Sequence, residues 1–291
     1  MERALRTQLA ARLGELTGTR PDPDAARPVG GGCINQAHRF GDCFVKFNAA
    51  ALADMFAAEA DALAELEAGG VRVPRPIDHG VLAGQAYLAL EYLPLQPLSG
   101  AAAATLGRQL AGLHRQPRSR FGWHRDNTIG ATPQPNPPDG DWLSFWRDQR
   151  LGHQLKLAAD NGHRGRLVER GERLLAVLGR LLAGHDPQPS LLHGDLWGGN
   201  AAMLADGTPV LFDPASYHGD READLAMTEL FGGFGPGFHA SYREAWPVDD
   251  GYPLRRDLYN LYHVLNHLNL FGGGYRAQAE RLIDRLLAAA G

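Results

Sequence analysis

Three polar residues between positions 191 and 214 have the types and spacing that phosphoryl transfer from ATP requires. Asp195 ends a His-Gly-Asp triplet after a short apolar run, Asn200 comes five residues later, and Asp213 follows a second apolar run. One carboxylate can take or orient the proton of an accepting hydroxyl. Amide and carboxylate oxygens are the hard ligands that Mg²⁺ prefers. We therefore predict Asp195 as the catalytic base and Asn200 and Asp213 as Mg²⁺ ligands.

The same stretch also has a structural interpretation, in which its aspartates, glycines and asparagine form the turns of β-hairpins. Against this, an aspartate followed by an asparagine five residues later is the spacing of a kinase catalytic loop. The triplet differs from the His-Arg-Asp of protein kinases, and Asp-Pro-Ala stands where they have Asp-Phe-Gly. These differences indicate the small-molecule branch of the kinase-like fold.

Composition narrows the class of protein. The chain has 291 residues, of which 44% are hydrophobic and 21% charged, which suits one large domain or two lobes. The net charge of −4 and the lack of a basic run argue against a nucleic-acid partner. No apolar run approaches the roughly 20 residues that span a bilayer, so we expect no membrane association.

Two cysteines, Cys33 and Cys43, are too few for a disulfide framework or a zinc site. The first 16 residues have helical spacing and lack the apolar core of a signal peptide. We therefore expect a cytoplasmic protein that begins with an amphipathic helix.

Only two of the 29 basic residues are lysines, Lys46 and Lys156. Lys46 ends the second strand of a predicted hairpin that turns at Gly41-Asp42, where a lysine would contact the α- and β-phosphates of ATP. Glu59 follows thirteen residues later on a predicted helix from 50 to 68, and we predict that it pairs with Lys46. Glu65 is a possible substitute, and a solvated helical carboxylate is the structural alternative for Glu59.

Two further segments could contact a nucleotide through their backbone. Glycines from Gly30 to Gly32 precede the hairpin and could present N–H groups to phosphates, although a plain glycine-rich hairpin is equally compatible. A predicted strand from 86 to 93 ends at Pro94, and its last residues, Glu91 to Leu93 with Tyr92 between them, are placed to read an adenine edge. A core strand would have the same sequence.

The order of predicted elements indicates an α+β, bilobal, protein-kinase-like fold. An N-terminal helix, an antiparallel sheet and the helix over 50–68 fill residues 1–94, the predicted N-lobe, and helices dominate residues 95–291, the predicted C-lobe. Residues 121–141 form a long irregular stretch, which is more often functional than not, and we place it near the acceptor pocket. Helices are predicted over 101–115, 142–159, 164–182, 224–231, 237–246, 254–271 and 275–289.

The chain resembles the fructosamine (ketosamine) kinase family, which is related to the aminoglycoside and choline kinases. The resemblance rests on GGGCINQAHRF, FVKFN, HGDLWGGN, FDPASYHGDREADLAMTELFGGF and LYHVLNHLNLFGGGY, and it extends from about residue 30 to 274. It implies an ATP-dependent kinase that phosphorylates a ketosamine, free or on a protein lysine. Phosphorylation at the sugar O3 destabilises such an adduct, so the implied role is deglycation. Ribulosamines, erythrulosamines and fructosamines all stay open as substrates.

The resemblance also implies roles for particular residues. It places Gly31, Gly32, Asn35 and Gln36 in a loop over the phosphates, next to Lys46 and Glu59. Trp197 would form a wall against the sugar, with a core tryptophan as the alternative.

The sequence gives less specific candidates for residues that bind the phosphoryl acceptor. Glu222 lies in an acidic cluster with Asp220 and Asp224 and could meet the ketosamine amine, while Asp224 is better explained as a helix N-cap. Asn266 could bind the sugar or make a helix–helix hydrogen bond. Cys33, inside the phosphate loop, is a candidate redox-sensitive thiol or simply a small turn residue.

Two alternatives remain open. The acceptor could be an aminoglycoside, choline or homoserine rather than a ketosamine. A pseudokinase acting as a binding module would be expected to lack one of Lys46, Asp195, Asn200 and Asp213, and all four are present. The sequence leaves the oligomeric state, monomer or dimer, undetermined.

Overall fold

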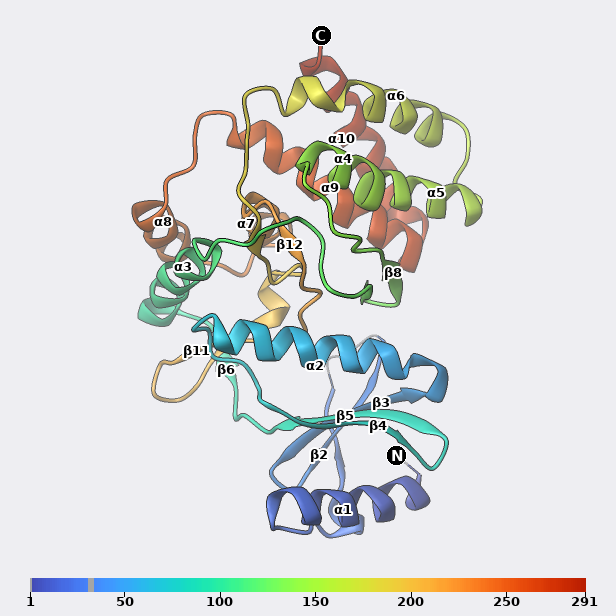
Figure 1. Cartoon of the computed structure of the whole chain (residues 1–291), viewed down its shortest axis with the longest axis vertical. Coiled ribbons are helices and arrows are strands. Elements are labelled where there is room, and N and C mark those ends of the chain that lie inside the picture. Colours follow the sequence, from blue (N-terminus) through green and yellow to red (C-terminus); the bar gives the residue numbers. More distant parts are fainter. Residues whose placement is uncertain (1, 31–33) are drawn as a thin grey trace.

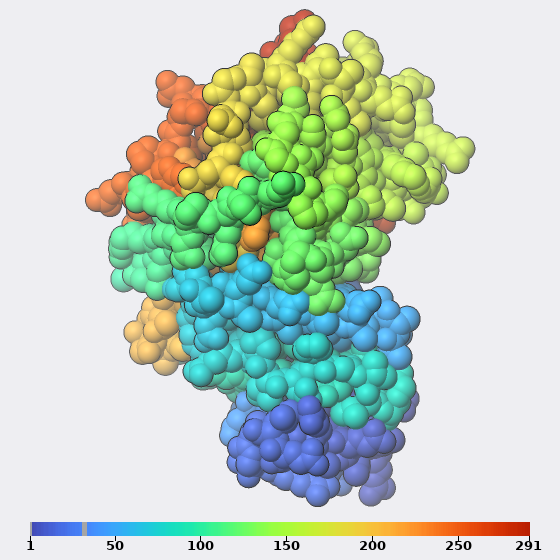
Figure 2. Space-filling model, viewed as in Figure 1, coloured from blue at the N-terminus to red at the C-terminus, as the bar shows by residue number. Residues whose placement is uncertain are grey.

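The computed structural model describes residues 2–30 and 34–291. Figure 1 shows a β-sheet flanked by two helices at one end of the long axis and a mainly helical region at the other. Figure 2 shows the same division, with the blue-to-cyan first part of the chain below the green-to-red remainder. The predicted division into a β-rich first part and a mainly helical second part is confirmed.

The sheet has five antiparallel strands in the order β1-β2-β3-β5-β4. The predicted hairpin is confirmed, with Gly41 at φ +63° in the turn where glycine is favoured. Strand β4 was missed because its edge position allows Pro76 and Gly80 in it and leaves most of its residues half-exposed. The strands are β1 (Arg27–Pro28), β2 (Gln36–Phe40), β3 (Cys43–Ala49), β4 (Pro76–Leu82) and β5 (Gln85–Glu91).

Strand alternation decides which helix each side chain meets, because successive residues point to opposite faces of a sheet. Helix α1 (Arg3–Thr17) covers one face and α2 (Ala53–Ala68) the other (Figure 1). Val45 and Phe47 of β3 pack into the core on the α1 side. Lys46 lies between them in sequence and therefore points to the α2 side, where it meets Glu59.

Helices make up most of the second part, and the predicted helical segments are confirmed to within a few residues. The segment predicted as one helix over 142–159 is interrupted by a π-helical turn, Trp146–Gly152. The helices are α3 (Gly100–His114), α4 (Trp142–Phe145), α5 (His153–Asp160), α6 (Arg166–Leu181), α7 (Glu222–Leu230), α8 (Pro236–Ala245), α9 (Tyr252–Phe271) and α10 (Arg276–Ala289).

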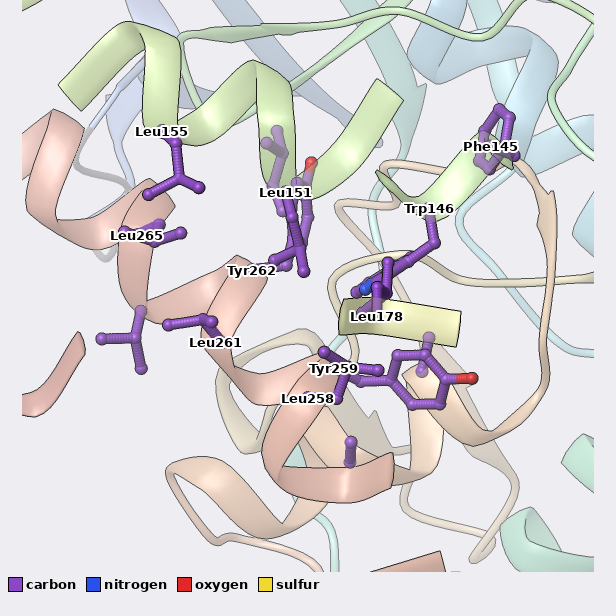
Figure 3. Close-up of a cluster of buried hydrophobic side chains, with 14 of the residues drawn as sticks. Phe145, Trp146, Leu151, Leu155, Leu178, Leu258, Tyr259, Leu261, Tyr262 and Leu265 are labelled. Carbon is purple, nitrogen blue, oxygen red and sulfur yellow. The ribbon is translucent and has the colours of Figure 1, made fainter. Parts of the chain in front are cut away.

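The core of this region is built around α9. Figure 3 shows Trp146 and Leu178 packed against the α9 side chains Tyr259 and Tyr262. The rings of Trp146 and Tyr259 meet edge to face with centroids 4.8 Å apart, an arrangement that aromatic pairs favour. No helix within residues 2–30 and 34–291 has the length and apolar character needed to cross a bilayer.

A second core joins the two parts of the chain. Leu63 and Leu66 of α2 and Leu88 of β5 belong to the same buried cluster as Leu106 of α3 and Leu211, which lies far along the chain. Because shared apolar burial opposes separation, the two parts are packed together rather than linked loosely. The division at residue 94 stays a prediction about folding units.

Short strands carry the segment with the predicted catalytic residues. The β10–β11 hairpin pairs with β6, and β9 pairs with β12, so that residues 192–200 run between two paired elements. The bounds are β6 (Gln96–Pro97), β7 (Asn127–Ile129), β8 (Thr132–Gln134), β9 (Ser190–Leu191), β10 (Ala201–Met203), β11 (Pro209–Leu211) and β12 (His218–Gly219).

A buried carboxylate on α7 holds this segment from behind. Asp224, only 1% exposed, accepts hydrogen bonds from the backbone N–H groups of His193 at 2.7 Å and Gly194 at 2.9 Å. Asp224 is thus no helix N-cap, because α7 begins at Glu222 and the carboxylate points at another segment. Gly194 has φ +84°, and a Cβ there would lie 2.1 Å from the carbonyl oxygen of Ala215. Only glycine fits this close crossing.

Hydrogen bonding keeps Asp224 ionised. Burial alone would raise its pKa, but the His114 imidazole, 3.2 Å away, and the N–H of Gly194 hold the pKa below its ordinary value. The other imidazole nitrogen of His114 is 2.8 Å from the hydroxyl of Tyr242. Asp224 therefore connects α3 and α8 to the segment that follows β9.

We predict that Asp224→Ala lowers the free energy of unfolding by about 2–6 kcal/mol, because two buried N–H groups lose their acceptor at about 1–3 kcal/mol each. Urea unfolding measures this change. Asp250→Ala is the matched control, since Asp250 is exposed, and it should change the value by less than about 0.5 kcal/mol. Equal stability of the two variants would contradict the anchoring role.

Candidate active site

The lysine from the sheet and an aspartate from the far part of the chain meet directly. The Nζ atom of Lys46 is 2.5 Å from Oε1 of Glu59 and 2.7 Å from Oδ1 of Asp213. Burial opposes the charge of Lys46, but the carboxylates of Asp213 and Glu59 raise its pKa above the ordinary value. Lys46 is therefore a fixed cation at the junction of the two parts of the chain.

Asn200 connects the other two predicted residues. Its Nδ2 donates to the carbonyl oxygen of Asp195 at 2.9 Å, to Oδ2 of Asp195 at 3.2 Å and to the carbonyl oxygen of Asp213 at 3.4 Å. With its nitrogen committed in this way, Asn200 has its amide oxygen left to bind a ligand. All four predicted polar residues thus lie in one connected cluster.

The conformation of Asp213 is unusual and suits a ligand-binding role. Its φ of +56° lies in the left-handed region, which costs energy for a residue other than glycine. The side chain is 48% exposed although Lys46 binds one of its oxygens. Lys46 binds only one of the two carboxylate oxygens, and Asn200 hydrogen-bonds to the backbone carbonyl of the same residue. Asp213 and Asn200 thus carry, close together, the kind of oxygen atoms that a hard cation binds.

The carboxyl group of Asp195 has a raised pKa. Burial raises its pKa to about 7, the nearby Asp213 carboxylate adds to this rise, and the hydrogen bond from Asn200 opposes it. A general base works best when its pKa lies near the working pH. A pKa of about 7 suits the predicted role of Asp195 as a general base, and that role stays a prediction.

Residues 121–141, predicted to be irregular, contain the β7–β8 hairpin, and this hairpin holds the residues after Asp213. Gln134 of β8 donates 3.0 Å to the carbonyl oxygen of Ala215, and Asn127 of β7 donates 2.8 Å to that of Ser216. The hydroxyl of Tyr262 on α9 donates to Gln134 at 2.6 Å. This stretch thus supports the active site from behind. Gln134 was not predicted, because the sequence around it does not show that this glutamine is buried.

Helix α2, which carries Glu59, is tied to the other part of the chain by side chains. Glu65 accepts from the indole N–H of Trp123 at 3.0 Å, and Asp61 pairs with Arg125 at 2.7 Å. Glu65 is thus not a substitute for Glu59. These contacts keep α2, and with it Glu59, beside Lys46.

The glycine-rich segment is only partly described. The predicted phosphate-loop residues Gly31 and Gly32 and the candidate redox residue Cys33 lie outside the described residues. The Nδ2 atom of Asn48 donates 2.8 Å to Oδ1 of Asn35, which joins the end of that segment to β3. Gln36 begins β2 opposite Phe47, one position from Lys46. The roles of Asn35 and Gln36 toward phosphates stay predictions.

The three residues predicted to read adenine differ in which of their hydrogen-bonding groups already have a partner. The N–H of Tyr92 already donates 2.9 Å to the carbonyl oxygen of Asp42, so it is not available to a base. The carboxylate of Glu91 pairs with Arg72 at 2.7 Å. The N–H of Glu91 likewise donates 2.9 Å to the carbonyl oxygen of Arg75. Adenine recognition through the carbonyl group of Glu91 and the backbone of Leu93 stays a prediction.

Trp197, two residues after Asp195, is not a core residue. Its side chain is 41% exposed, and its ring meets that of Phe231 edge to face at 6.4 Å. A Cβ at Gly199 would lie 2.3 Å from the indole, so glycine at that position makes room for the ring. Trp197 can therefore offer an aromatic surface beside the base, and its contact with sugar stays a prediction.

Glu222 has a different partner from the expected amine. Both of its carboxylate oxygens accept from Arg255, at 2.6 and 2.9 Å, and the pair is buried. Glu222 lies with His185 and Asp220 beside a cavity of about 310 Å³ whose lining includes none of the cluster around Lys46. Because its charge is already matched in the interior, we correct the prediction that Glu222 binds substrate.

Asn266 also has protein partners. It is buried, its Oδ1 accepts from Gln154 of α5 at 3.3 Å, and its Nδ2 is 3.5 Å from the carbonyl oxygen of Ile129. The helix–helix alternative is therefore the better description, and we do not carry Asn266 into the acceptor site.

Comparison with known proteins agrees with this geometry. A family model for fructosamine kinase matches residues 5–289. A probable ketoamine kinase of Synechocystis is 46% identical over 287 residues, covering 96% of each chain. A chloroplastic protein-ribulosamine 3-kinase of Arabidopsis thaliana is 43% identical over 267 residues, covering 89% of this chain and 81% of the relative.

Solved structures show the same relationship. A putative fructosamine-3-kinase from Haemophilus somnus superposes with a TM-score of 0.89 at 28% identity, over 98% of both chains. One from Thermobifida fusca has a TM-score of 0.83 at 34% identity, over 96% of this chain and 98% of the other. An aminoglycoside phosphotransferase, at a TM-score of 0.64 and 16% identity over 97% of this chain and 99% of the other, shares the fold. From its sequence and its structure together, the chain belongs to the fructosamine kinase family and is an ATP-dependent kinase that phosphorylates a sugar hydroxyl.

Proposed function

We propose that this protein transfers the γ-phosphate of ATP to the O3 hydroxyl of ketosamines, with ribulosamines or fructosamines on small amines or protein lysines as acceptors. The reaction would destabilise the adduct and so promote deglycation. The observation that carries the proposal is the direct contact of Lys46 with Asp213, which unites the phosphate-binding and base-bearing segments. Relatives named ketoamine and ribulosamine kinases support the acceptor class.

Each polar residue has one task in this mechanism. Asp195 accepts a hydrogen bond from the acceptor hydroxyl and takes its proton as the phosphoryl group transfers. The ammonium of Lys46 has three N–H donors. Glu59 and Asp213 use two of them, which leaves the third for a phosphate oxygen. Glu59 keeps the ammonium in place from the α2 side.

The donor set fits magnesium. Within residues 2–30 and 34–291, no hydrogen bond involves the second carboxylate oxygen of Asp213 or the amide oxygen of Asn200. Both are hard ligands of the type that Mg²⁺ takes together with phosphate oxygens and water. We assign these two residues as the Mg²⁺ ligands. The ion, when bound, neutralises charge on the phosphates.

The other candidate functions have weaker support. Likeness to aminoglycoside and choline kinases, at 14–16% identity, concerns the fold alone. A pseudokinase module is disfavoured because Lys46, Asp195, Asn200 and Asp213 are present and in contact.

An ATP-consumption assay tests the acceptor class. We expect turnover with ribulose-lysine, fructose-lysine or erythrulose-lysine to exceed that with aminoglycosides, choline or homoserine by at least about a hundredfold in kcat/KM, since a site built for one set of hydroxyls rejects others strongly. Phosphorylation at O3 is read by NMR of the product. Preference for an aminoglycoside would overturn the assignment.

We predict that Asp195→Asn lowers kcat by about 10²–10⁴-fold, because the amide cannot take a proton. The dissociation constant for ATP, measured by calorimetry, should change by less than about threefold, since phosphate contacts lie with other groups. A variant that loses ATP binding to the same extent as turnover would show that Asp195 holds the nucleotide instead.

The two lysines provide a matched pair. Lys46→Met should lower kcat/KM for ATP by about 10²–10³-fold, the usual effect of removing one charge-stabilising donor. Lys156→Met should leave kcat/KM unchanged, because Lys156 is exposed and its one ion pair in the described part of the chain is with Asp160 on its own helix. Similar kinetics for both variants would remove Lys46 from the site.

A further inference from the structure

The exposed aromatic side chains of the protein gather in one place. Within residues 2–30 and 34–291, the exposed phenylalanine and tryptophan side chains are Trp197, Phe231 and Phe271, at 41%, 40% and 54%. The ring of Phe231 meets that of Trp197 at 6.4 Å. The imidazole of His267 lies 4.8 Å from the ring of Phe231 and 5.6 Å from that of Phe271. These four residues therefore form one contiguous surface, which we call the aromatic patch.

A close backbone approach holds Phe231 beside Trp197. Gly233 has φ +99°, and a Cβ there would lie 2.6 Å from the Cα of Gly198. A Cβ at Gly198 would in turn lie 2.8 Å from the carbonyl oxygen of Gly232, so the two segments can touch only through glycines. Phe231 directly precedes Gly232, and Trp197 directly precedes Gly198. The segment that follows α7 is thus packed onto the segment that carries the predicted base.

The other half of the patch comes from the end of α9. His267 and Phe271 are four residues apart on this helix, so their side chains lie on the same face. Figure 1 shows this end of α9 beside the β7–β8 hairpin, on the side of the helical part that faces the sheet. A Cβ at Gly130 in the hairpin turn would lie 3.1 Å from Leu270 and 3.8 Å from Ile34. The end of α9 therefore lies where the two parts of the chain meet, as the catalytic cluster does.

His267 offers a hydrogen-bond acceptor within the patch. Its Nδ1 is 2.8 Å from the carbonyl oxygen of His263, which can only accept, so Nδ1 carries a proton. Burial lowers the pKa of His267, which keeps the imidazole neutral at pH 7. The other nitrogen, Nε2, then has a lone pair, and no hydrogen bond in the described part of the chain involves it. The patch thus carries no charge and presents one acceptor to an incoming donor.

These properties match the arm of a ketosamine, by which we mean its amine and the carbon chain attached to that amine. The sugar hydroxyl must lie at Asp195, two residues before Trp197, so the arm extends over neighbouring surfaces. Aromatic ring faces attract a protonated amine, and a lysine chain buries apolar surface against them. A stable interface with a second folded chain takes about 20–30 residues on each side, far more than this patch contains. The acceptor's arm is therefore the occupant that the patch fits.

We propose that the aromatic patch binds the arm of ketosamine acceptors, with Phe231 and Phe271 against its carbon chain and ammonium and with Nε2 of His267 accepting a hydrogen bond from the ammonium. The proposal rests on the proposed function and names the part of the site that recognises the amine. Glu222, the carboxylate first expected to meet the amine, is instead paired with Arg255. The patch determines specificity and takes no part in proton transfer.

Steady-state kinetics tests this with two acceptors: ribulose-lysine, or fructose-lysine if the wild type turns it over faster, and the same sugar on methylamine, which lacks the long chain. Phe271→Ala should raise KM for the lysine adduct about five- to twentyfold, because apolar burial and a ring face are lost. KM for the methylamine adduct should rise less. The value of kcat and the KM for ATP should change by less than about twofold, as expected when only acceptor binding is weakened. Leu16→Ala, an exposed apolar residue of α1, is the matched control and should behave as the wild type does.

Two further variants separate the contributions to binding. Phe271→Leu keeps an apolar side chain and removes the ring face, so KM for both adducts should rise about two- to fivefold. His267→Phe keeps a ring and removes the acceptor nitrogen, and we expect it to raise KM for both adducts about tenfold through loss of a hydrogen bond to a charged group. Melting temperatures confirm that each variant is folded, which Phe271→Ala should be because Phe271 is exposed.

The outcomes distinguish this proposal from the proposed function. A wild type that turns over neither ketosamine shows that the proposed function is wrong, and this proposal then fails with it. If the wild type is active, the proposal is overturned when Phe271→Ala keeps the wild-type KM, when it loses kcat instead, or when Leu16→Ala shows the same rise. An unchanged KM in Phe271→Leu or in His267→Phe would overturn the assigned contact with the ammonium.

Discussion

The structure depends on one buried ammonium group shared by two carboxylates. Lys46 comes from the sheet, Glu59 from the helix above it, and Asp213 from a segment 167 residues further along the chain. Removing one member of such a buried cluster leaves an uncompensated charge, which typically costs about 3–5 kcal/mol. The contact that brings together the residues proposed to bind phosphate and Mg²⁺ therefore also holds the two parts of the chain in register.

The residues that carry chemistry are held by buried polar groups behind them. Asp224 binds two backbone N–H groups of the segment that precedes Asp195, and Gln134 binds a backbone carbonyl after Asp213. Backbone groups in such segments cannot all pair within strands, and leaving them unpaired in the interior is costly. Side chains from α7 and β8 supply the missing partners. The positive φ of Asp213 is tolerated because its surroundings are fixed in this way.

The two corrected assignments have a common cause. Glu222 and Asn266 are polar residues in segments that resemble a sugar-kinase site, and their side chains could bind an acceptor. In the structure Arg255 neutralises Glu222, and Gln154 hydrogen-bonds to Asn266. A buried polar group needs a partner. The sequence around a polar residue does not show whether its partner is a ligand or another residue more than thirty positions away.

The sequence by itself determined the elements and the chemical set. Spacing predicted that Asp195, Asn200 and Asp213 act together, because all three lie in one short local segment, and their roles stay a proposal. Periodicity located most helices because a buried face repeats along one element. Tertiary structure alone decided which distant side chains meet: the contact of Lys46 with Asp213, the support from Gln134 and the edge strand β4. Local pattern records which face of an element is buried, whereas a long-range contact depends on how several elements pack together, and no single segment encodes that packing.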